Sequence, residues 1–394
     1  MIIRGIMADR KLFFLVLILI TIGLIFSYSL STYTVIFFEY EPYHFVARQA
    51  LFVLLALGLM WMMSGLVPEV WLHRIGLLLF GTGLMLMASM PFLPESSVTA
   101  VGGARRWIRI LGFSLAPVEF FKVGFIYFLA WSFSRKFVHH PGTNRFKEEW
   151  ALALPYIAVF LIAVILIAVL QNDLGQVVVL GMTLAFMMLF AGRSIMFFIS
   201  LVLTAFALFV TFIIIADHRV LRIKLWWVNV QDAILSIFPA SIADKLHIEM
   251  TEEPYQIGHS LNAIHNGGLF GTGLGNGNFK LGFLSEVHTD FVLSGITEEL
   301  GLVGILIVTL IFVALIWRIF KIANRAQNRV FFLFALGIGM MMAFSFIINA
   351  FGISGLAPIK GLSLPFISYG GSSLIASSIA IGMVLMISQR VNMK

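Results

Sequence analysis

The chain has 394 residues, of which 60% are hydrophobic and only 11% charged, and its mean hydropathy is +1.00. This composition excludes an ordinary soluble globular domain, and the long apolar runs exclude an outer-membrane barrel, whose strands would be short and alternating. The absence of cysteine excludes disulfides and thiolate metal sites. The formal charge of +7 does not indicate a nucleic-acid partner, because the cations flank apolar runs.

Apolar runs of about 18 residues or more predict ten membrane-spanning helices. In chain order they cover residues 11–30, 46–65, 75–93, 120–133, 151–170, 174–191, 195–216, 291–317, 330–351 and 372–388. No small-residue cleavage site follows the first run, so we expect a retained span and not a signal peptide. The fourth run is short, and we expect it to extend over residues 117–119 and 134–137. The predicted fold is an all-α polytopic bundle of ten transmembrane helices in a single domain, residues 1–394.

The distribution of cations predicts the orientation of this bundle. With the N-terminus inside, fifteen of the 26 Lys and Arg residues lie in short inner segments, so we expect both termini in the cytoplasm. The other eleven lie on the outer side, where those close to the bilayer surface could hold an anionic head group. Two of them, Lys245 and Lys280, are interpreted as solvated loop charges.

A long connection between the seventh and eighth spans, residues 217–289, is predicted to be a large extracytoplasmic loop. It opens with "HRVLRIKLWWVN", in which cations and tryptophans alternate with aliphatic residues. This pattern predicts a helix lying in the membrane interface, although a structural anchor explains it equally well. The glycine-rich stretch at 267–278 matches no phosphate-binding pattern. We interpret it as a backbone-dense turn that folds tightly against the bundle.

Cationic motifs precede the fourth span. Arg105 and Arg106 flank Trp107, which suits either an aromatic belt with solvated arginines or a pair of guanidinium groups that bind a diphosphate. Glu119 and Lys122 are three residues apart at the start of the span. This spacing predicts an intrahelical ion pair that supports a site and does no chemistry.

Two polar interruptions follow. The stretch "QNDLGQ" at 171–176 is interpreted as a tight outer turn in which Asp173 caps the next helix. The stretch "PIKGLSLPFISYGGSS" at 358–373 predicts irregular backbone, which membranes tolerate only where protein or a water-filled cavity surrounds it. Lys360 in this stretch is either an anion ligand that points into a cavity or a snorkelling lysine.

The stretch "EVHTDFVLSGITEELG" at 286–301 places four carboxylates at the mouth of a span, where ionisable groups are expensive. On a helix, Asp290 and Glu298 fall on one polar side and Glu299 on the opposite side. Asp290 is reachable from outside, and Glu286 is a neighbour one turn earlier. Glu298 lies deeper and is interpreted as a buried structural carboxylate.

Taken together, the motifs "GGARRWI", "PVEFFK", "QNDLG", "HTDF" with "EELG", and "KGLSLPFISYGGSS" resemble the SEDS family (FtsW/RodA) over nearly the whole chain. The resemblance implies a ten-span enzyme of the bacterial cytoplasmic (inner) membrane that polymerises peptidoglycan from lipid II. It also implies that Asp290 is the essential aspartate, that Lys360 is an essential lysine, and that Arg105 and Lys122 are functionally important. The residues of the last motif are similar to those of the cell-division branch of the family, which implies a location at the septum.

The sequence departs from the family pattern at two places. Asn172 stands where the family usually has proline, which is expected to loosen that turn. Ser345 stands where the family usually has glutamine ahead of Asn349, which puts in doubt any role for an amide there.

The implied reaction is an inverting glycosyl transfer that expels a lipid diphosphate. It needs a carboxylate as general base and fixed positive charge at the leaving group. We expect Asp290 to be the base and the diphosphate to be held by cations, and we expect four further residues to help bind substrate. The substrate-binding residues are thus Arg105, Arg106, Lys122, Lys360, Glu286, His288, Ser368 and Ser372, with Glu119 and Glu298 in support. A divalent cation, Mg²⁺ or Mn²⁺, could bridge carboxylate and phosphate, but no spacing demands a metal site.

The resemblance also implies partners: lipid II and polyprenyl-diphosphate-linked glycan, a class B penicillin-binding protein (an FtsI-like transpeptidase), divisome proteins and membrane lipid. An alternative function is a lipid II flippase, since ten spans with a polar stripe would suit transport. A flippase should carry ionisable groups near the midplane, whereas most candidates here gather on the outer side. A third hypothesis is a scaffold of the division machinery.

Overall fold

The computed structural model describes residues 9–94, 97–101, 104–110, 112–137, 146–215, 217–236, 238–248, 255–358 and 361–391. Among these residues, ten helices lie on the ten predicted apolar runs. They are α1 (Arg10–Leu30), α3 (His44–Ser64), α4 (Pro68–Ser89), α5 (Pro117–Lys136), α6 (Phe146–Val164), α7 (Leu174–Phe190), α8 (Ile195–Ile214), α12 (Val292–Arg325), α13 (Arg329–Ile353) and α14 (Gly371–Ser388). The π-helix η2 (Ile165–Leu170) continues α6, and the 3₁₀ turn η1 (Met90–Phe92) follows α4.

Eight helices within the described ranges are long and apolar enough to cross a membrane. The two that fall outside this group are α7, which has 17 residues, and α5, which carries Glu119 and Lys122 near its start and Arg135 and Lys136 at its end. α5 is nevertheless buried along most of its length, and it packs closely on α4. A Cβ on Gly124 of α5 would lie 2.1 Å from the backbone nitrogen of Phe80, so only glycine allows this approach.

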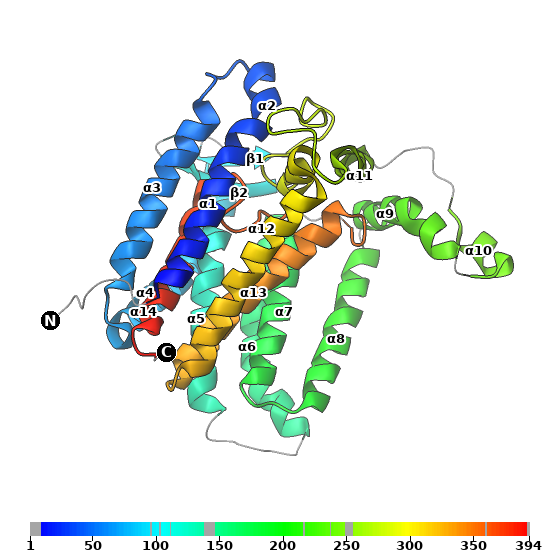
Figure 1. Cartoon of the computed structure of the whole chain (residues 1–394). Helices are drawn as coiled ribbons and strands as arrows, with labels where there is room; N and C mark the ends of the chain where they lie inside the picture. The colour runs from blue at the N-terminus through cyan, green and yellow to red at the C-terminus, as the bar shows by residue number, and fades with distance from the viewer. Residues whose placement is uncertain are drawn as a thin grey trace.

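The expectation of an all-α fold is wrong in one respect. Three short strands, β1 (Val98–Val101), β2 (Ala104–Ile110) and β3 (Phe113–Leu115), form an antiparallel sheet in the order β1-β2-β3. The sheet lies near one end of the bundle, between α4 and α5 in the chain (Figure 1). A search for long apolar runs cannot detect strands of three to seven residues, whose signal is alternation.

α12 is broken at Gly301, whose φ of 69° and ψ of −169° are not helical. The glycine-rich stretch fills this break with its own backbone. Leu302 and Val303 donate their amide hydrogens to the carbonyls of Gly268 and Leu269 at 2.9 and 3.1 Å. The glycine stretch donates in return to the carbonyls of Glu298 and Glu299. This confirms that the stretch is a backbone-dense turn folded tightly against the bundle.

The segment between α8 and α12 contains three more helices: α9 (Asp217–Leu235), α10 (Ala240–Leu246) and α11 (Tyr255–Gly267). α8 stands at the edge of the bundle, and α9 and α10 extend away from it (Figure 1). The indole of Trp226 donates to Gly355 O at 2.7 Å, and that of Trp227 donates to Leu246 O at 2.9 Å. These bonds support the anchoring role of α9.

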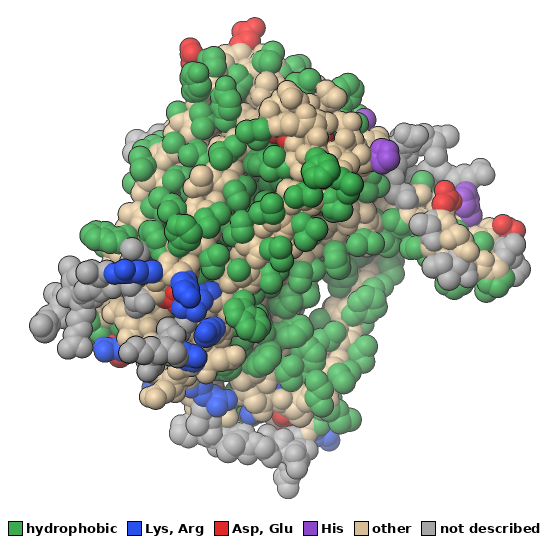
Figure 2. Space-filling view, viewed as in Figure 1, with side chains coloured by type: hydrophobic (Ala, Val, Ile, Leu, Met, Phe, Trp, Pro, Cys, Tyr) green, Lys and Arg blue, Asp and Glu red, His purple; other side chains and the backbone are tan. Residues whose placement is uncertain are grey.

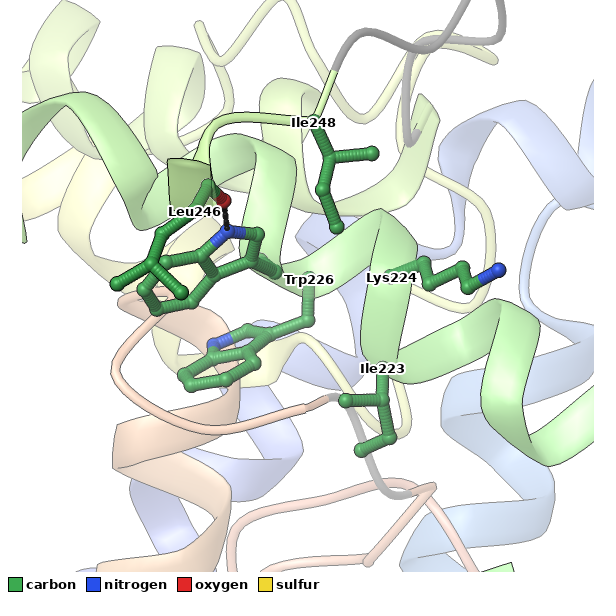
Figure 3. Close-up of a pocket in the computed structure, with 6 residues that line it drawn as sticks. Ile223, Lys224, Trp226, Leu246 and Ile248 are labelled. Atoms are coloured by element: carbon green, nitrogen blue, oxygen red, sulfur yellow. Dashed lines mark hydrogen bonds between the residues drawn. The ribbon is translucent and has the colours of Figure 1, made fainter. Parts of the chain in front are cut away.

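A small apolar cavity lies beside the two indoles of α9. Trp226, Leu246 and Ile248 surround it, whereas the Lys224 ammonium points away from the indoles (Figure 3).

The first and last described residues lie at the same end of the bundle (Figure 1). Asp9, which caps α1, pairs with Arg318 near the end of α12 at 2.9 Å. Arg390, which follows α14, pairs with Glu69 at the start of α4 at 2.7 Å. The sheet and the glycine-rich stretch lie toward the opposite end (Figure 1).

Candidate functional site

Asp290 lies on a compact turn immediately before α12. Glu286 begins this turn with a φ of 55°, and its carbonyl accepts hydrogen bonds from the amides of Thr289 and Asp290 at 3.1 and 3.0 Å. The Glu286 side chain is exposed and accepts from the Thr289 hydroxyl at 3.0 Å, whereas Asp290 is half-buried. Since α12 begins only at Val292, the predicted helix does not reach back to Glu286, and the turn brings the two carboxylates together instead.

The segment 361–369, which precedes α14, holds this turn in place. The Ser368 hydroxyl donates to Thr289 O at 2.6 Å, and the Tyr369 amide donates to His288 O at 2.9 Å. The same Ser368 oxygen accepts from the amide of Leu364 at 2.8 Å. Ser368 therefore supports the backbone beside Asp290, and its predicted contact with substrate stays a prediction.

Gly361 brings the same segment against the Asp290 carboxylate. A Cβ on Gly361 would lie 2.6 Å from Asp290 Oδ2, so no other residue fits without displacing the carboxylate. Lys360 precedes Gly361 and lies outside the described residues. The fold thus places Gly361, the residue after Lys360, next to Asp290. The prediction that Lys360 and Asp290 share a site requires this proximity.

Asn349 of α13 connects the two segments. Its side-chain Nδ2 donates to Asp290 O at 2.8 Å and to Leu362 O at 2.7 Å. The side chain is buried, and its Oδ1 has no hydrogen-bond partner among the described residues. The sequence reasoning placed no role on this amide. A usable signal was present, because an asparagine inside an apolar run of about 20 residues is expensive in a membrane.

The surroundings of Asp290 suit a general base. Burial, together with the negative charges of Glu286 and Asp173, raises the pKa of Asp290 to about 7 against the opposing effect of Arg106. Burial lowers the pKa of the neighbouring His288, whose ring contacts Phe45. A carboxylate with a pKa close to neutral can take up a proton in one step and release it in the next.

Arg106 holds the turn between η2 and α7. Its guanidinium donates to Gln171 O at 2.9 Å and to Asn172 O at 2.7 Å, and it lies 3.9 Å from Asp173 Oδ2. Asp173 caps α7 by accepting from the amide of Gln176 at 3.3 Å, which confirms the predicted capping turn. Asn172 has a φ of 52°, which proline cannot adopt because its ring fixes φ near −65°.

Glu119 and Lys122 form the predicted ion pair, with Lys122 Nζ 2.9 Å from Glu119 Oε2. Gln176 of α7 closes a triad, because it accepts from Lys122 at 2.8 Å and donates to Glu119 at 2.9 Å. All three side chains are buried. The triad ties α5 to α7, and the support of a substrate site by Glu119 stays a prediction. A contact between Lys122 and substrate stays a prediction.

Glu298 is a buried structural carboxylate, as predicted. It accepts from Asn266 Nδ2 at 2.9 Å and from the amide of Asn278 at 2.7 Å. Glu299 has different partners, since it accepts from Ser29 Oγ at 2.6 Å and pairs with Lys280 Nζ at 2.8 Å.

The interpretation of Lys280 as a solvated loop charge is wrong. Its side chain is 3% exposed, because the glycine-rich stretch folds over the broken helix and carries Lys280 onto Glu299. Lys245, by contrast, is exposed as expected.

Two other predicted site residues, Ser372 and Arg105, contact other parts of the structure. The Ser372 hydroxyl donates to Ser114 O and accepts from the amide of Ala116, both at 3.0 Å, and so joins α14 to the start of α5. Arg105 and Arg106 are neighbours on β2, where a β-bulge opposite Thr99 and Ala100 interrupts the regular alternation of side chains. Arg105 lines a separate cavity. Within the described ranges, no three His, Asp or Glu side chains are grouped to hold a metal ion.

Comparisons with known proteins agree on one family. The model of the FtsW/RodA/SpoVE family, described as cell cycle protein, matches residues 10–393. A probable peptidoglycan glycosyltransferase FtsW of Helicobacter pylori is 48% identical over 382 residues, covering 97% of this chain and 98% of the relative. The protein of that name in Geobacter sulfurreducens is 32% identical over 383 residues, covering 97% of this chain and 95% of the relative.

Two solved structures share the fold. The rod shape determining protein RodA of Thermus thermophilus is 24% identical, with a TM-score of 0.65, covering 98% of each chain. A chain of a peptidoglycan synthase complex, solved to describe the coordination of polymerization and crosslinking, is 23% identical with a TM-score of 0.71. It covers 97% of this chain and 98% of that chain.

Proposed function

The chain belongs to the FtsW/RodA/SpoVE family of cell cycle proteins, and on that premise we propose that it is a peptidoglycan glycosyltransferase. It polymerises lipid II into glycan strands by inverting transfer at the outer face of the cytoplasmic membrane, for wall synthesis at the division septum. The observation that carries this proposal is the position of Asp290, a half-buried carboxylate with a pKa of about 7 against the segment that begins at Gly361.

In the proposed step, Asp290 takes the proton from the 4-hydroxyl of the acceptor sugar. The hydroxyl oxygen attacks the anomeric carbon of the donor, and the bond from that carbon to the diphosphate oxygen breaks with its electron pair. A single displacement inverts the anomeric centre, so an α-linked donor gives a β-linked product. The polyprenyl diphosphate leaves with the electron pair, and its tail stays in the lipid throughout.

Fixed cations stabilise the charge that develops on the leaving diphosphate. Lys360 is the first candidate, because its neighbour Gly361 lies against Asp290. Arg106 is the second, since its charge acts on Asp290 from the turn at Gln171. If Mg²⁺ or Mn²⁺ takes part, Asp290 and Glu286 are the carboxylates that would hold it, and its charge would offset that of the diphosphate.

The proposed topology has ten spans, both termini in the cytoplasm and the segment 217–289 outside. Lys and Arg side chains gather at the end of the bundle where α1 begins and α12 ends, and they are nearly absent from the rest of that face (Figure 2). Cations concentrate on the cytoplasmic side of membrane proteins. Asp290 lies toward the opposite end, which this orientation places outside.

We propose a class B penicillin-binding protein, an FtsI-like transpeptidase, as the partner, together with divisome proteins at the septum. The solved relative in a peptidoglycan synthase complex supports the first partner. The names of the FtsW relatives support the role in division.

A lipid II flippase is the alternative function. It requires ionisable groups that are free to act near the midplane. Glu298 and Glu299 are buried carboxylates within the first turns of α12, and they are engaged by Asn266, Lys280 and the glycine-rich stretch. This arrangement favours the enzyme.

The decisive experiment reconstitutes the full chain with its transpeptidase partner, supplies lipid II and measures glycan polymer. We expect polymer from the wild type and none from Asp290→Ala. Polymer that survives Asp290→Ala would remove the general-base role. If a wild-type complex forms no polymer yet moves lipid II across vesicle membranes, the flippase is correct.

A further inference from the structure

A second cavity lies beside the turn that Arg106 holds. It has a volume of ≈ 290 Å³ and lies between the end of α4, the strand β2 and the end of η2. Arg105, Gln171 and Asn172 line its polar end, and Met87, Met90 and Val169 line its apolar end. Asp290 is not among the residues that line this cavity.

The polar end of this cavity contains an unsatisfied acceptor. The Gln171 side chain is only 1% exposed, and its Oε1 has no hydrogen-bond partner among the described residues. Its Nε2 donates to Met90 Sδ at 3.7 Å. A buried amide oxygen without a donor is costly, so rotation of this side chain toward a ligand that brings an O–H or N–H would be favoured.

The apolar end opens toward the lipid. Val169 is 50% exposed, and Met85, one turn before the cavity on α4, is 72% exposed. The cavity lies where α4 and η2 both end. An acyl or polyprenyl chain of a lipid that enters between these two helices would therefore reach polar groups only at the helix ends. The π-helix η2 opens the backbone at this point, and such bulges often mark functional sites.

We propose that this cavity binds the phosphate-bearing head group of a membrane lipid. Arg105 pairs with the phosphate, a hydroxyl or amide N–H of the head group donates to Gln171 Oε1, and the apolar chain follows Met87 and Val169 into the bilayer. Two sources share this chemistry, namely a phospholipid such as phosphatidylglycerol and a polyprenyl-linked phosphate. The inference rests on residence in a membrane and not on glycosyl transfer.

The test uses the purified full-length protein in detergent, titrated with dioleoyl phosphatidylglycerol and measured by native mass spectrometry. Dioleoylglycerol, which has the same chains without phosphate, is the ligand control. Arg105→Gln removes the proposed phosphate partner, and Arg109→Gln removes an equal charge from an exposed position on the same strand that does not line the cavity. Val169→Trp fills the apolar end from a side chain that faces lipid, so the bundle core is unchanged.

We expect Arg105→Gln to weaken phosphatidylglycerol binding about fivefold, because the lipid phosphate loses one neighbouring cation. Arg109→Gln should bind as the wild type does, Val169→Trp should lose the bound lipid, and dioleoylglycerol should bind weakly to all variants. Equal loss in the two arginine variants, or equal binding of the two lipids, would overturn the proposal. If undecaprenyl phosphate displaces the bound phosphatidylglycerol, the site belongs to lipid-linked sugar carriers. If phosphatidylglycerol stays bound, the site belongs to phospholipid. Because no step measures polymer, these outcomes are independent of the proposed activity.

Discussion

The side-chain amide of Asn349 donates a hydrogen bond of 2.8 Å to the backbone carbonyl of Asp290. The same nitrogen donates to Leu362 O at 2.7 Å, so one side chain fixes the distance between the proposed base and the segment that follows Lys360. Asn349 touches no reacting atom and is a positioning residue. Displacement of a catalytic group by about 1 Å can cost a hundredfold in rate.

Asn349→Ala should leave a folded protein that polymerises lipid II at least about tenfold more slowly, because two carbonyls lose their donor and the turn at Asp290 is released. Ser345→Ala is the matched control, since among the described residues its hydroxyl bonds only to Met341 O, one turn earlier on the same helix. The rate and its pH profile are measured together. Equal rates in the two variants would remove Asn349 from this role.

The rate should depend on pH through Asp290. Its pKa of about 7 is raised by burial and by Glu286, so the reactive carboxylate is present above that pH and protonated below it. We expect polymerisation to fall about tenfold for each pH unit below 7. Glu286→Gln removes a charge that raises the pKa of Asp290, so its acid limb should move to lower pH. A limb that moves upward would contradict this assignment.

Lys360→Ala should give folded protein without polymerisation, because the leaving diphosphate loses a fixed cation. Lys360→Arg keeps the charge and should retain part of the activity. The two variants are compared at equal expression and with equal binding of the transpeptidase partner. Normal polymer from Lys360→Ala would exclude this lysine from the diphosphate site.

Lys280→Met should lower the free energy of unfolding by about 3–5 kcal/mol, since it leaves the buried Glu299 carboxylate without its cation. Adding Glu299→Gln should recover part of the loss. Lys245→Met, at an exposed position, is the control and should change little. Thermal unfolding in detergent provides the measurement, and equal melting temperatures for Lys280→Met and Lys245→Met would show that the pair contributes nothing.

Gly301→Ala should destabilise the protein by about 3 kcal/mol or more, because a side chain is strained at a positive φ. The added Cβ would also lie 2.4 Å from the nitrogen of Gly271, so the glycine-rich stretch must move. Gly58→Ala, which meets nothing within 4 Å inside α3, should be neutral or slightly stabilising. Similar melting temperatures for the two variants would show that the break in α12 is not maintained by this contact.

Much of the fold could be predicted from local sequence. A run of about 18 apolar residues predicts a span wherever it occurs, and each predicted run coincides with a helix. The pair of Glu119 and Lys122 and the cap at Asp173 are equally local, because their partners lie three residues apart. Asp290 as the candidate base was also found by sequence, from the cost of ionisable groups at the mouth of a span and from its motif.

Contacts between distant segments could not be predicted. Asn349 lies 59 residues from Asp290, and Lys280 lies 19 residues from Glu299. The partners in the first contact and at the break in α12 are backbone carbonyls and amides, which carry no sequence signature because almost every residue has them. Both arginines lie on β2, yet Arg106 holds the turn at Gln171 and Asn172 whereas Arg105 lines a cavity.

The sequence by itself determined the membrane class, the placement of the helices and the identity of the candidate base. These depend on composition and on short-range spacing, which the chain carries without folding. Only the tertiary structure decided what holds Asp290 in place, which carboxylates are already paired, and that Arg106 holds a turn whereas Arg105 lines a cavity. Those properties arise when segments far apart in the chain bury polar groups against one another, since each buried group must then find a partner.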